Sequence, residues 1–271
     1  MPEGHVTHRL ARALTGTFGQ HEVGVSSPQG RFAESAALLD GHVLAGAESF
    51  GKNLFVEFRT GLPETFLHIH LGLIGKFNLA PAAPPQGIVR LRISDGQTAA
   101  DLRGPQTCAL VSAARCDEVV AALGPDPIRD DADPDGGYAR VRRSGKSIAA
   151  LLMDQKVAAG VGNIFRAEVL FRHRRNPMTP GNRISAKEWA SMYADLSQLM
   201  RRAVEVGSID TVRDEHLPEA MGRAPRDDVH GGEVYVYRRT GQPCHVCGTP
   251  VKSAIVESRN LYWCSTCQRR R

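Results

Sequence analysis

Four cysteines near the C-terminus have the spacing of a metal site. They form two Cys-x2-Cys pairs, Cys244 with Cys247 and Cys264 with Cys267, and sixteen residues separate the pairs. Each pair can present two thiolates to one side of a Zn²⁺ ion, and four thiolates complete its tetrahedral coordination at about 2.3 Å. Because the protein supplies all four ligands, we expect one structural zinc ion with no open position for catalysis.

The residues between the cysteine pairs are predicted to form a hairpin. Its strands are expected at 251–256 and 261–263, joined by a turn at 257–260. Arg259 in this turn would have little freedom, which suits a guanidinium that reaches a phosphate or a base. A solvated turn arginine is the alternative. His245, inside the first pair, is expected to be a bystander and not a ligand.

The first residues also carry potential chemistry. Removal of Met1 would leave a free secondary amine on Pro2. An α-amino group titrates at about 7.7–8.0, and the positive end of a helix dipole favours its neutral, nucleophilic form. Such an amine can attack an aldehyde-like carbon and form an imine, while Glu3 moves protons. The alternative is that Pro2 and Glu3 simply begin a helix.

A glycine-rich junction in the middle of the chain is a candidate anion site. Gly160-Val161-Gly162-Asn163 joins two helices predicted at 148–155 and 164–173. Asn163 then lies at the N-terminus of the second helix, where free backbone N–H groups attract anions. Nearby basic residues strengthen this interpretation: Lys156, Arg166, Arg172, Arg174 and Arg175. A plain structural hairpin of helices is the alternative.

The elements that position these residues differ along the chain. Periodic apolar residues predict helices at 5–14 and 185–206. Between about 22 and 113 the chain contains short apolar runs separated by Gly, Pro and Asp, which predict a β-sandwich or barrel. The clearest predicted strands are 54–58, 65–70, 89–93 and 108–112.

These elements predict an α+β multidomain protein. We expect a leading helix and β-sandwich at 1–120, a linker at 121–138, a helical domain at 139–233, and a zinc-ribbon hairpin at 234–271. The first domain contains a helix and many strands, the helical domain includes a connector at 207–233, and the last domain contains the cysteines.

Charge is distributed unevenly along the 271 residues. Residues 1–120 hold ten Lys and Arg against eleven Asp and Glu, whereas residues 121–271 hold 24 against 18. With a sequence pI of about 9.0, this pattern favours a polyanionic partner, although a solvated basic surface is equally compatible. No apolar run reaches the roughly 18 residues of a membrane helix, and no secretory signal is recognisable. We therefore expect a cytoplasmic protein without a membrane partner.

Four features together resemble the formamidopyrimidine-DNA glycosylase/endonuclease VIII family. They are the Pro2-Glu3-Gly4 start, Gly51-Lys52 at a strand turn, Gly160-Val161-Gly162-Asn163, and the zinc hairpin with Arg259. They occur in the family's order and span essentially the whole chain. The Pro-Glu-Gly start is most similar to an actinobacterial member of the endonuclease VIII branch.

The resemblance implies a bifunctional base-excision enzyme with a helix-two-turn-helix domain at its centre. Pro2 would displace an oxidised base at the sugar C1′ as a Schiff base, and β- and δ-elimination would cut the strand. Glu3 would donate a proton to the sugar ring, and Lys52 would contact a phosphate and assist catalysis. Asn163 and Arg259 would hold the kinked backbone. The implied partner is double-stranded DNA with oxidised bases or abasic sites, bound by a monomer associated with the bacterial nucleoid.

Three further residues acquire roles from the same resemblance. His70 resembles another phosphate contact, and Leu73 aligns with the side chain that fills the space left by the flipped base. Such a plug offsets part of the cost of extruding a base, which is a few kcal/mol. Arg103 would face the orphaned base.

The chain departs from the family pattern at two places. Val6 stands where many members have a second glutamate, and the stretch 101–105 lacks the Arg-Arg-Phe wedge of the purine branch. Oxidised pyrimidines are therefore the favoured substrates, with ring-opened purines as an alternative.

Two other functions compete with the enzyme. A non-catalytic damaged-DNA-binding protein of the same fold would keep Asn163, Arg259 and the zinc site without needing Pro2 or Glu3. A zinc-ribbon RNA-binding protein is disfavoured because the first 120 residues are not basic.

Overall fold

The computed structural model describes residues 2–228 and 231–269. The chain separates into two compact units, residues 1–122 and residues 123–271, called unit 1 and unit 2 below. Met1, whose removal the amine chemistry requires, lies outside the described residues. No helix in the described ranges is long and apolar enough to cross a membrane.

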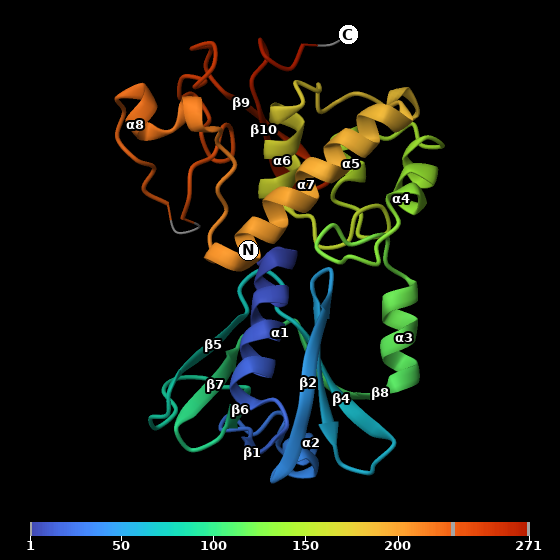
Figure 1. Ribbon diagram of the computed structural model, residues 1–271, viewed down its shortest axis with the longest axis vertical. Helices are drawn as coiled ribbons and strands as arrows, with labels where there is room; N and C mark the ends of the chain where they lie inside the picture. The colour runs from blue at the N-terminus through green and yellow to red at the C-terminus, as the bar shows by residue number, and fades with distance from the viewer. Residues whose placement is uncertain (1, 229–230, 270–271) are drawn as a thin grey trace. The chain divides into compact units, whose positions relative to one another are not determined.

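Unit 1 is built around an antiparallel sheet with a helix along it (Figure 1). Its elements are α1 (Gly4–Phe18), β1 (His21–Ser26), α2 (Ala33–Leu39), β2 (His42–Phe50), β3 (Asn53–Arg59), β4 (Glu64–His70), β5 (Lys76–Pro81), β6 (Leu91–Ser94), β7 (Thr98–Arg103), β8 (Thr107–Ser112) and α3 (Ala113–Ala121). The strand order is β5-β7-β6-β1-β2-β3-β4-β8. The first half of β1 pairs with β2 and its second half with β6, so β1 belongs to both layers. The predicted leading helix and β-sandwich are confirmed.

Helix α1 is longer than its apolar pattern predicts. It continues through Gly16, beyond the predicted end at residue 14, and stops at Phe18. Burial explains the extension, since Leu14 and Phe18 are both fully buried against the sandwich. The helix ends before Gly19, whose ψ of 132° is not helical, and glycine suits this position because a Cβ there would lie 2.4 Å from the carbonyl oxygen of Thr15.

Unit 2 combines a helical core with a small hairpin. Its elements are α4 (Pro134–Val141), α5 (Ile148–Leu151), α6 (Asn163–Arg172), α7 (Ala186–Val206), α8 (Pro218–Met221), β9 (Lys252–Val256) and β10 (Arg259–Trp263), with short 3-10 turns at Gly181–Arg183 and Asp214–His216. Helix α7 begins with a capping box in which Ser185 and Glu188 satisfy each other's backbone N–H groups. Its Trp189 is buried and donates a hydrogen bond to the Pro134 carbonyl at 2.9 Å. Helix α4 begins at Pro134, so the expected linker at 121–138 contains the first residues of this helix.

The helix predicted at 148–155 is much shorter in the structure. It ends at Leu151, and the chain continues in turns as far as α6. Gln155 organises these turns, because its side-chain amide donates to the carbonyls of Met153 and Val161 and its oxygen accepts from the Gly160 N–H, each at 3.0 Å. The turns thereby bring Asn163 to the first position of α6, as predicted.

The hairpin turn is tighter than the four-residue turn that we expected. Strands β9 and β10 pair from Lys252↔Trp263 to Val256↔Arg259, so only Glu257 and Ser258 form the turn. Both have a positive φ, 49° and 58°, as a two-residue turn matched to the strand twist requires. Arg259 is thus the first residue of β10 and is fixed by strand pairing.

Candidate active site and nucleic-acid interface

The N-terminus of α1 lies beside the turn that carries Lys52. Glu3 is fully buried at the N-cap position of the helix, where a carboxylate interacts favourably with the helix dipole. The hydroxyl of Thr7, one turn into the helix, donates to the Gly51 carbonyl at 2.9 Å. Gly51 (φ 60°) and Lys52 form the two-residue turn between β2 and β3. The hydrogen bond therefore holds the Lys52 turn against the helix that Pro2 and Glu3 begin.

His70 is held next to this turn as a neutral donor. In the pairing of β3 with β4, His70 lies opposite Asn53, which is the residue that follows Lys52 in the chain. Burial lowers the pKa of His70, the positive charge of Lys52 lowers the pKa further, and a hydrogen bond that the ring donates to Gln106 partly opposes this shift. The Gly72 N–H donates to His70 Nδ1 at 3.2 Å, so Nε2 of the neutral ring carries the proton. This arrangement suits donation to a phosphate oxygen or to Gln106.

Two apolar side chains stand exposed at the turn after β4. Leu73 is 53% exposed and Ile74 is 80% exposed. A positive φ at Gly72 shapes this turn, and a Cβ at Gly75 would lie 2.2 Å from the Leu71 carbonyl oxygen. Leu73 is therefore available as a plug, and Ile74 is a second exposed apolar residue that sequence reasoning missed.

Arg103 is engaged within unit 1. Its guanidinium donates to Asp101 Oδ2 at 3.0 Å and to the Gln86 carbonyl at 3.0 Å. Asp101 is also bound by Arg92 at 2.7 Å. A role for Arg103 opposite a flipped base remains a prediction, and it would require the guanidinium to share or leave these partners.

In unit 2, Asn163 and Arg166 bind the zinc hairpin to α6. The Asn163 amide donates to the Asn260 carbonyl at 2.9 Å, and the fully buried Arg166 binds both the Asn163 side chain and the Asn260 carbonyl. Asn260 directly follows Arg259, so the two predicted phosphate ligands are brought together. Within the described part of the chain, the Arg259 guanidinium makes no hydrogen bond or ion pair.

A buried glutamate fixes the start of the zinc module, and the sequence analysis did not single it out. Glu168 of α6 is fully buried. Its carboxylate accepts from the Thr211 hydroxyl at 2.6 Å and from the backbone N–H groups of Tyr235, Val236 and Tyr237 at 2.7–2.9 Å. An acidic residue among apolar neighbours in mid-helix was the available signal, since a buried charge must be fully hydrogen-bonded.

The four cysteines have the geometry of a zinc site. Their Sγ atoms all lie within 4.8 Å of one another. Cys244 and Cys267 are 3.9 Å apart, and Cys247 and Cys264 are 3.4 Å apart. Zinc–sulfur bonds of about 2.3 Å give a tetrahedron with edges of about 3.8 Å, so the donors fit one ion. His245 is outside the cluster, as expected.

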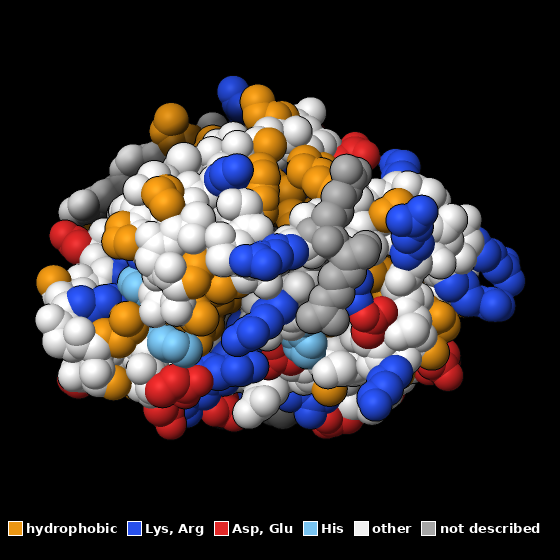
Figure 2. Space-filling view, turned by 90° about the horizontal axis from the view of Figure 1, so that it is seen from above, with side chains coloured by type: hydrophobic (Ala, Val, Ile, Leu, Met, Phe, Trp, Pro, Cys, Tyr) orange, Lys and Arg blue, Asp and Glu red, His pale blue; other side chains and the backbone are white. Residues whose placement is uncertain are grey.

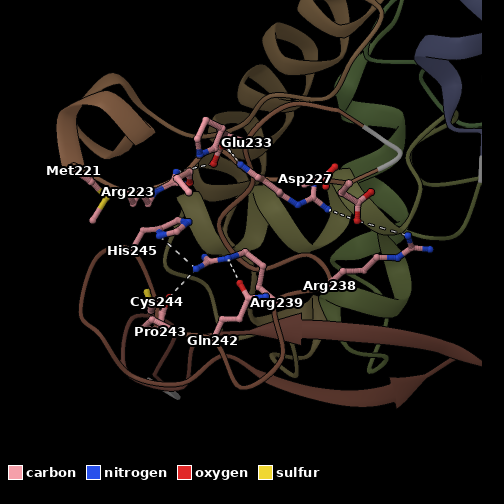
Figure 3. Close-up of a pocket in the computed structure, with 14 residues that line it drawn as sticks. Met221, Arg223, Asp227, Glu233, Arg238, Arg239, Gln242, Pro243, Cys244 and His245 are labelled. Carbon is pink, nitrogen blue, oxygen red and sulfur yellow. Dashed lines mark hydrogen bonds and ion pairs between the residues drawn. The ribbon is translucent and has the colours of Figure 1, made fainter.

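A cavity of about 510 Å³ lies between the zinc module and the preceding segment (Figure 3). Arg239 lines it and donates to the Gln242 side chain at 3.1 Å, with His245 Nδ1 at 3.4 Å. Arg223 pairs there with Glu233 at 2.6 Å. The charged residues of this cavity therefore mostly bind one another and join the segment to the module.

Comparison with known proteins gives three consecutive domain matches. Residues 1–108 match the formamidopyrimidine-DNA glycosylase N-terminal domain, residues 123–214 its H2TH domain, and residues 241–270 the zinc finger found in FPG and IleRS. Endonuclease 8 1 of Mycobacterium bovis is 45% identical over 278 residues, covering 99% of this chain and 100% of that protein. The chain belongs to the formamidopyrimidine-DNA glycosylase/endonuclease VIII family.

Other members of this family agree with the assignment. The formamidopyrimidine-DNA glycosylase of Thermus thermophilus is 31% identical over 275 residues, covering 99% of this chain and 97% of that protein. The Lactococcus lactis enzyme, solved non-covalently bound to DNA with an abasic site, has the same fold with a TM-score of 0.80 at 22% identity, covering 99% and 100% of the two chains.

Membership of the family establishes the coarse function. The protein is a DNA glycosylase of DNA repair that binds DNA, and its four cysteines hold one zinc ion. On the face shown in Figure 2, several Lys and Arg side chains form a short run from the centre toward the lower left, where Asp and Glu side chains adjoin it.

Proposed function

We propose that this family member is a bifunctional DNA glycosylase and abasic-site lyase that removes oxidised bases, with pyrimidines favoured, through its N-terminal proline. One observation carries the proposal. The Thr7–Gly51 hydrogen bond holds the Lys52 turn at the same end of α1 as Pro2 and buried Glu3. A nucleophile, a carboxyl group and a cation are thus gathered at one helix terminus.

The reaction uses these groups in order. The Pro2 nitrogen bonds to the sugar C1′ as the bond to the base breaks, and the base leaves with a proton. Glu3 protonates the ring oxygen, so the sugar opens to a Schiff base between Pro2 and C1′. Loss of a proton from C2′ expels the 3′ phosphate, and a second elimination expels the 5′ phosphate. Hydrolysis then releases Pro2.

The remaining residues hold the DNA during these steps. Lys52 and His70 contact phosphates beside the damaged nucleotide. Asn163 and Arg259 hold the backbone where it kinks, while Leu73 fills the space left by the extruded base. The partner is a DNA duplex with oxidised bases or abasic sites. The protein acts as a monomer. It works in the cytoplasm at the nucleoid, because the DNA that it repairs is located there.

Borohydride trapping on an abasic-site duplex tests the mechanism. Reduction of a Schiff base would leave a stable covalent adduct with the protein whose Pro2 is free, and an added residue before Pro2 would abolish that adduct. Mass spectrometry would first show that Met1 is absent from the free form.

Two other results would contradict the proposal. An adduct from both forms would move the nucleophile to a lysine, first of all Lys52. Intact binding of damaged DNA without any adduct would indicate a non-catalytic binding protein of the same fold.

A further inference from the structure

Unit 1 contains a cavity that has no part in the proposed glycosylase reaction. It is open to solvent on one side and has a volume of about 550 Å³, which is within the range of small-molecule pockets. Its lining comes from the end of α1, the strands β2, β3 and β4, and helix α3. The lining residues are Thr15, Gly46, Ala47, Glu48, Phe50, Phe55, Glu57, Phe66, Ala113, Cys116, Asp117 and Val120.

The cavity lies on the face of the sheet that α3 covers only in part. Cross-strand pairing places Glu48 opposite Phe55 and Glu57 opposite Phe66, so these four side chains share one face of the sheet. Helix α3 presents residues 113, 116, 117 and 120 to the cavity, which is the i, i+3, i+4, i+7 spacing of a single helical face. The cavity is therefore bounded by helices and strands and not by a loop.

Three phenylalanines make the cavity aromatic. Phe50 and Phe55 meet edge to face with their ring centroids 6.2 Å apart, and Phe55 also stacks on His68 at 4.6 Å. Burial, together with the proximity of His70 and Arg115, lowers the pKa of His68 to about 4, so the ring beneath Phe55 is neutral at pH 7. Electron-rich phenyl faces attract cations.

All charged residues that line the cavity are acidic. They are Glu48, Glu57 and Asp117, and no Lys, Arg or His is among the lining residues. Arg115, on the same helix, pairs with Glu118 at 2.8 Å and does not line the cavity. The lining thus carries three negative charges in a chain whose formal net charge is +5. Nucleic acid is excluded as the occupant, because a phosphate backbone would be repelled here.

We propose that this cavity binds a small organic ammonium ion whose apolar or aromatic body packs among Phe50, Phe55 and Phe66 while its charge meets Glu57 and Asp117. Both features of the lining are needed to specify this class. An anion would be repelled by the carboxylates, and a neutral apolar molecule would gain no attraction from them. The occupant would also touch Phe50, two residues before Lys52, at the end of β2.

Phenethylammonium is a suitable probe, with 2-phenylethanol as its neutral counterpart and 3-phenylpropionate as an anionic one. An NMR titration of the full chain without DNA would follow the methyl signals of Thr15 and Val120, with calorimetry for affinity. We expect saturable shifts with the ammonium ion, affinity about fivefold weaker for the alcohol, and no binding of the anion. This ratio corresponds to about 1 kcal/mol for a partly exposed ion pair.

Variants locate the site and its charge. Glu57→Gln with Asp117→Asn should reduce the ammonium affinity to that of the alcohol, and Ala113→Trp should block both by filling the cavity. Glu118→Gln on the same helix is the matched control and should leave binding unchanged. Equal affinities for the ammonium ion and the alcohol, absence of shifts at Thr15 and Val120, or unchanged binding in Ala113→Trp would each overturn the proposal. The titration needs no DNA, so its outcome is independent of the lyase mechanism.

Discussion

Glu3 differs from an ordinary surface carboxylate in both burial and position. It is fully buried and lies at the N-cap of α1, yet its side chain does not cap the helix. Because a buried carboxylate needs a specific reason to be retained, this geometry favours a role in proton transfer.

Replacement of Glu3 by Gln should separate the two activities. Gln keeps the shape but cannot donate the proton to the sugar ring, so removal of an oxidised base should fall by at least about 100-fold, as for loss of a general acid. Cleavage of a preformed abasic site, whose sugar already opens spontaneously, should be largely spared. Single-turnover assays on the two substrates measure this, and Glu34→Gln on α2 is a control in the same unit. Equal loss of both activities would refute this division of roles.

Among the elements, α6 and α7 are joined by a charged cluster. Asp195 of α7 accepts two hydrogen bonds from Arg172 at 2.7 Å and lies 3.2 Å from His173. Burial alone would raise the pKa of Asp195, but the hydrogen bonds from His173 and Arg172 outweigh it and lower the pKa to about 2. The cluster therefore stabilises unit 2 only while Asp195 is ionised.

This shift predicts a pH-dependent contribution to the free energy of unfolding. A depressed folded-state pKa stabilises the protein above the unfolded value near 3.8 and loses that effect as the pH falls toward 2. Asp195→Asn should cost about 2 kcal/mol at pH 6, and the difference from wild type should shrink on acidification. Urea unfolding of both proteins at each pH measures it. Asp130→Asn, at a carboxylate 92% exposed, is the control. A difference that does not depend on pH would contradict the assignment.

The sequence predicted a helix or a site well when all the residues that form the signal lie close together in the chain. Helix α6 starts at Asn163 as the glycines indicated, and the cysteine spacing predicted a site whose geometry fits zinc. The sequence could not show long-range polar contacts, such as Glu168 with the backbone of 235–237 or Thr7 with Gly51. These contacts depend on which buried groups meet after folding, and neither periodicity nor spacing records that.

For the whole molecule, we expect the binding of DNA to depend on a few well-placed cations more than on net charge. Many arginines of unit 2 are already paired with acids, as Arg172 is with Asp195 and Arg223 with Glu233. Arg259 differs because strand pairing fixes its backbone while its guanidinium makes no bond among the described residues. Such a side chain can meet a phosphate without first losing a partner.

Arg259→Ala should therefore weaken the binding of abasic-site DNA and reduce its salt dependence. Each phosphate neutralised releases counterions and contributes about 0.9 to the slope of log K against log[salt], so losing one contact should lower that slope by about one. Fluorescence anisotropy across a salt series measures both quantities. Arg202→Ala is a matched control, because Arg202 is 65% exposed on α7 and lies near Glu205. A weaker affinity with an unchanged slope would mean that Arg259 acts on the hairpin's structure and does not contact a phosphate.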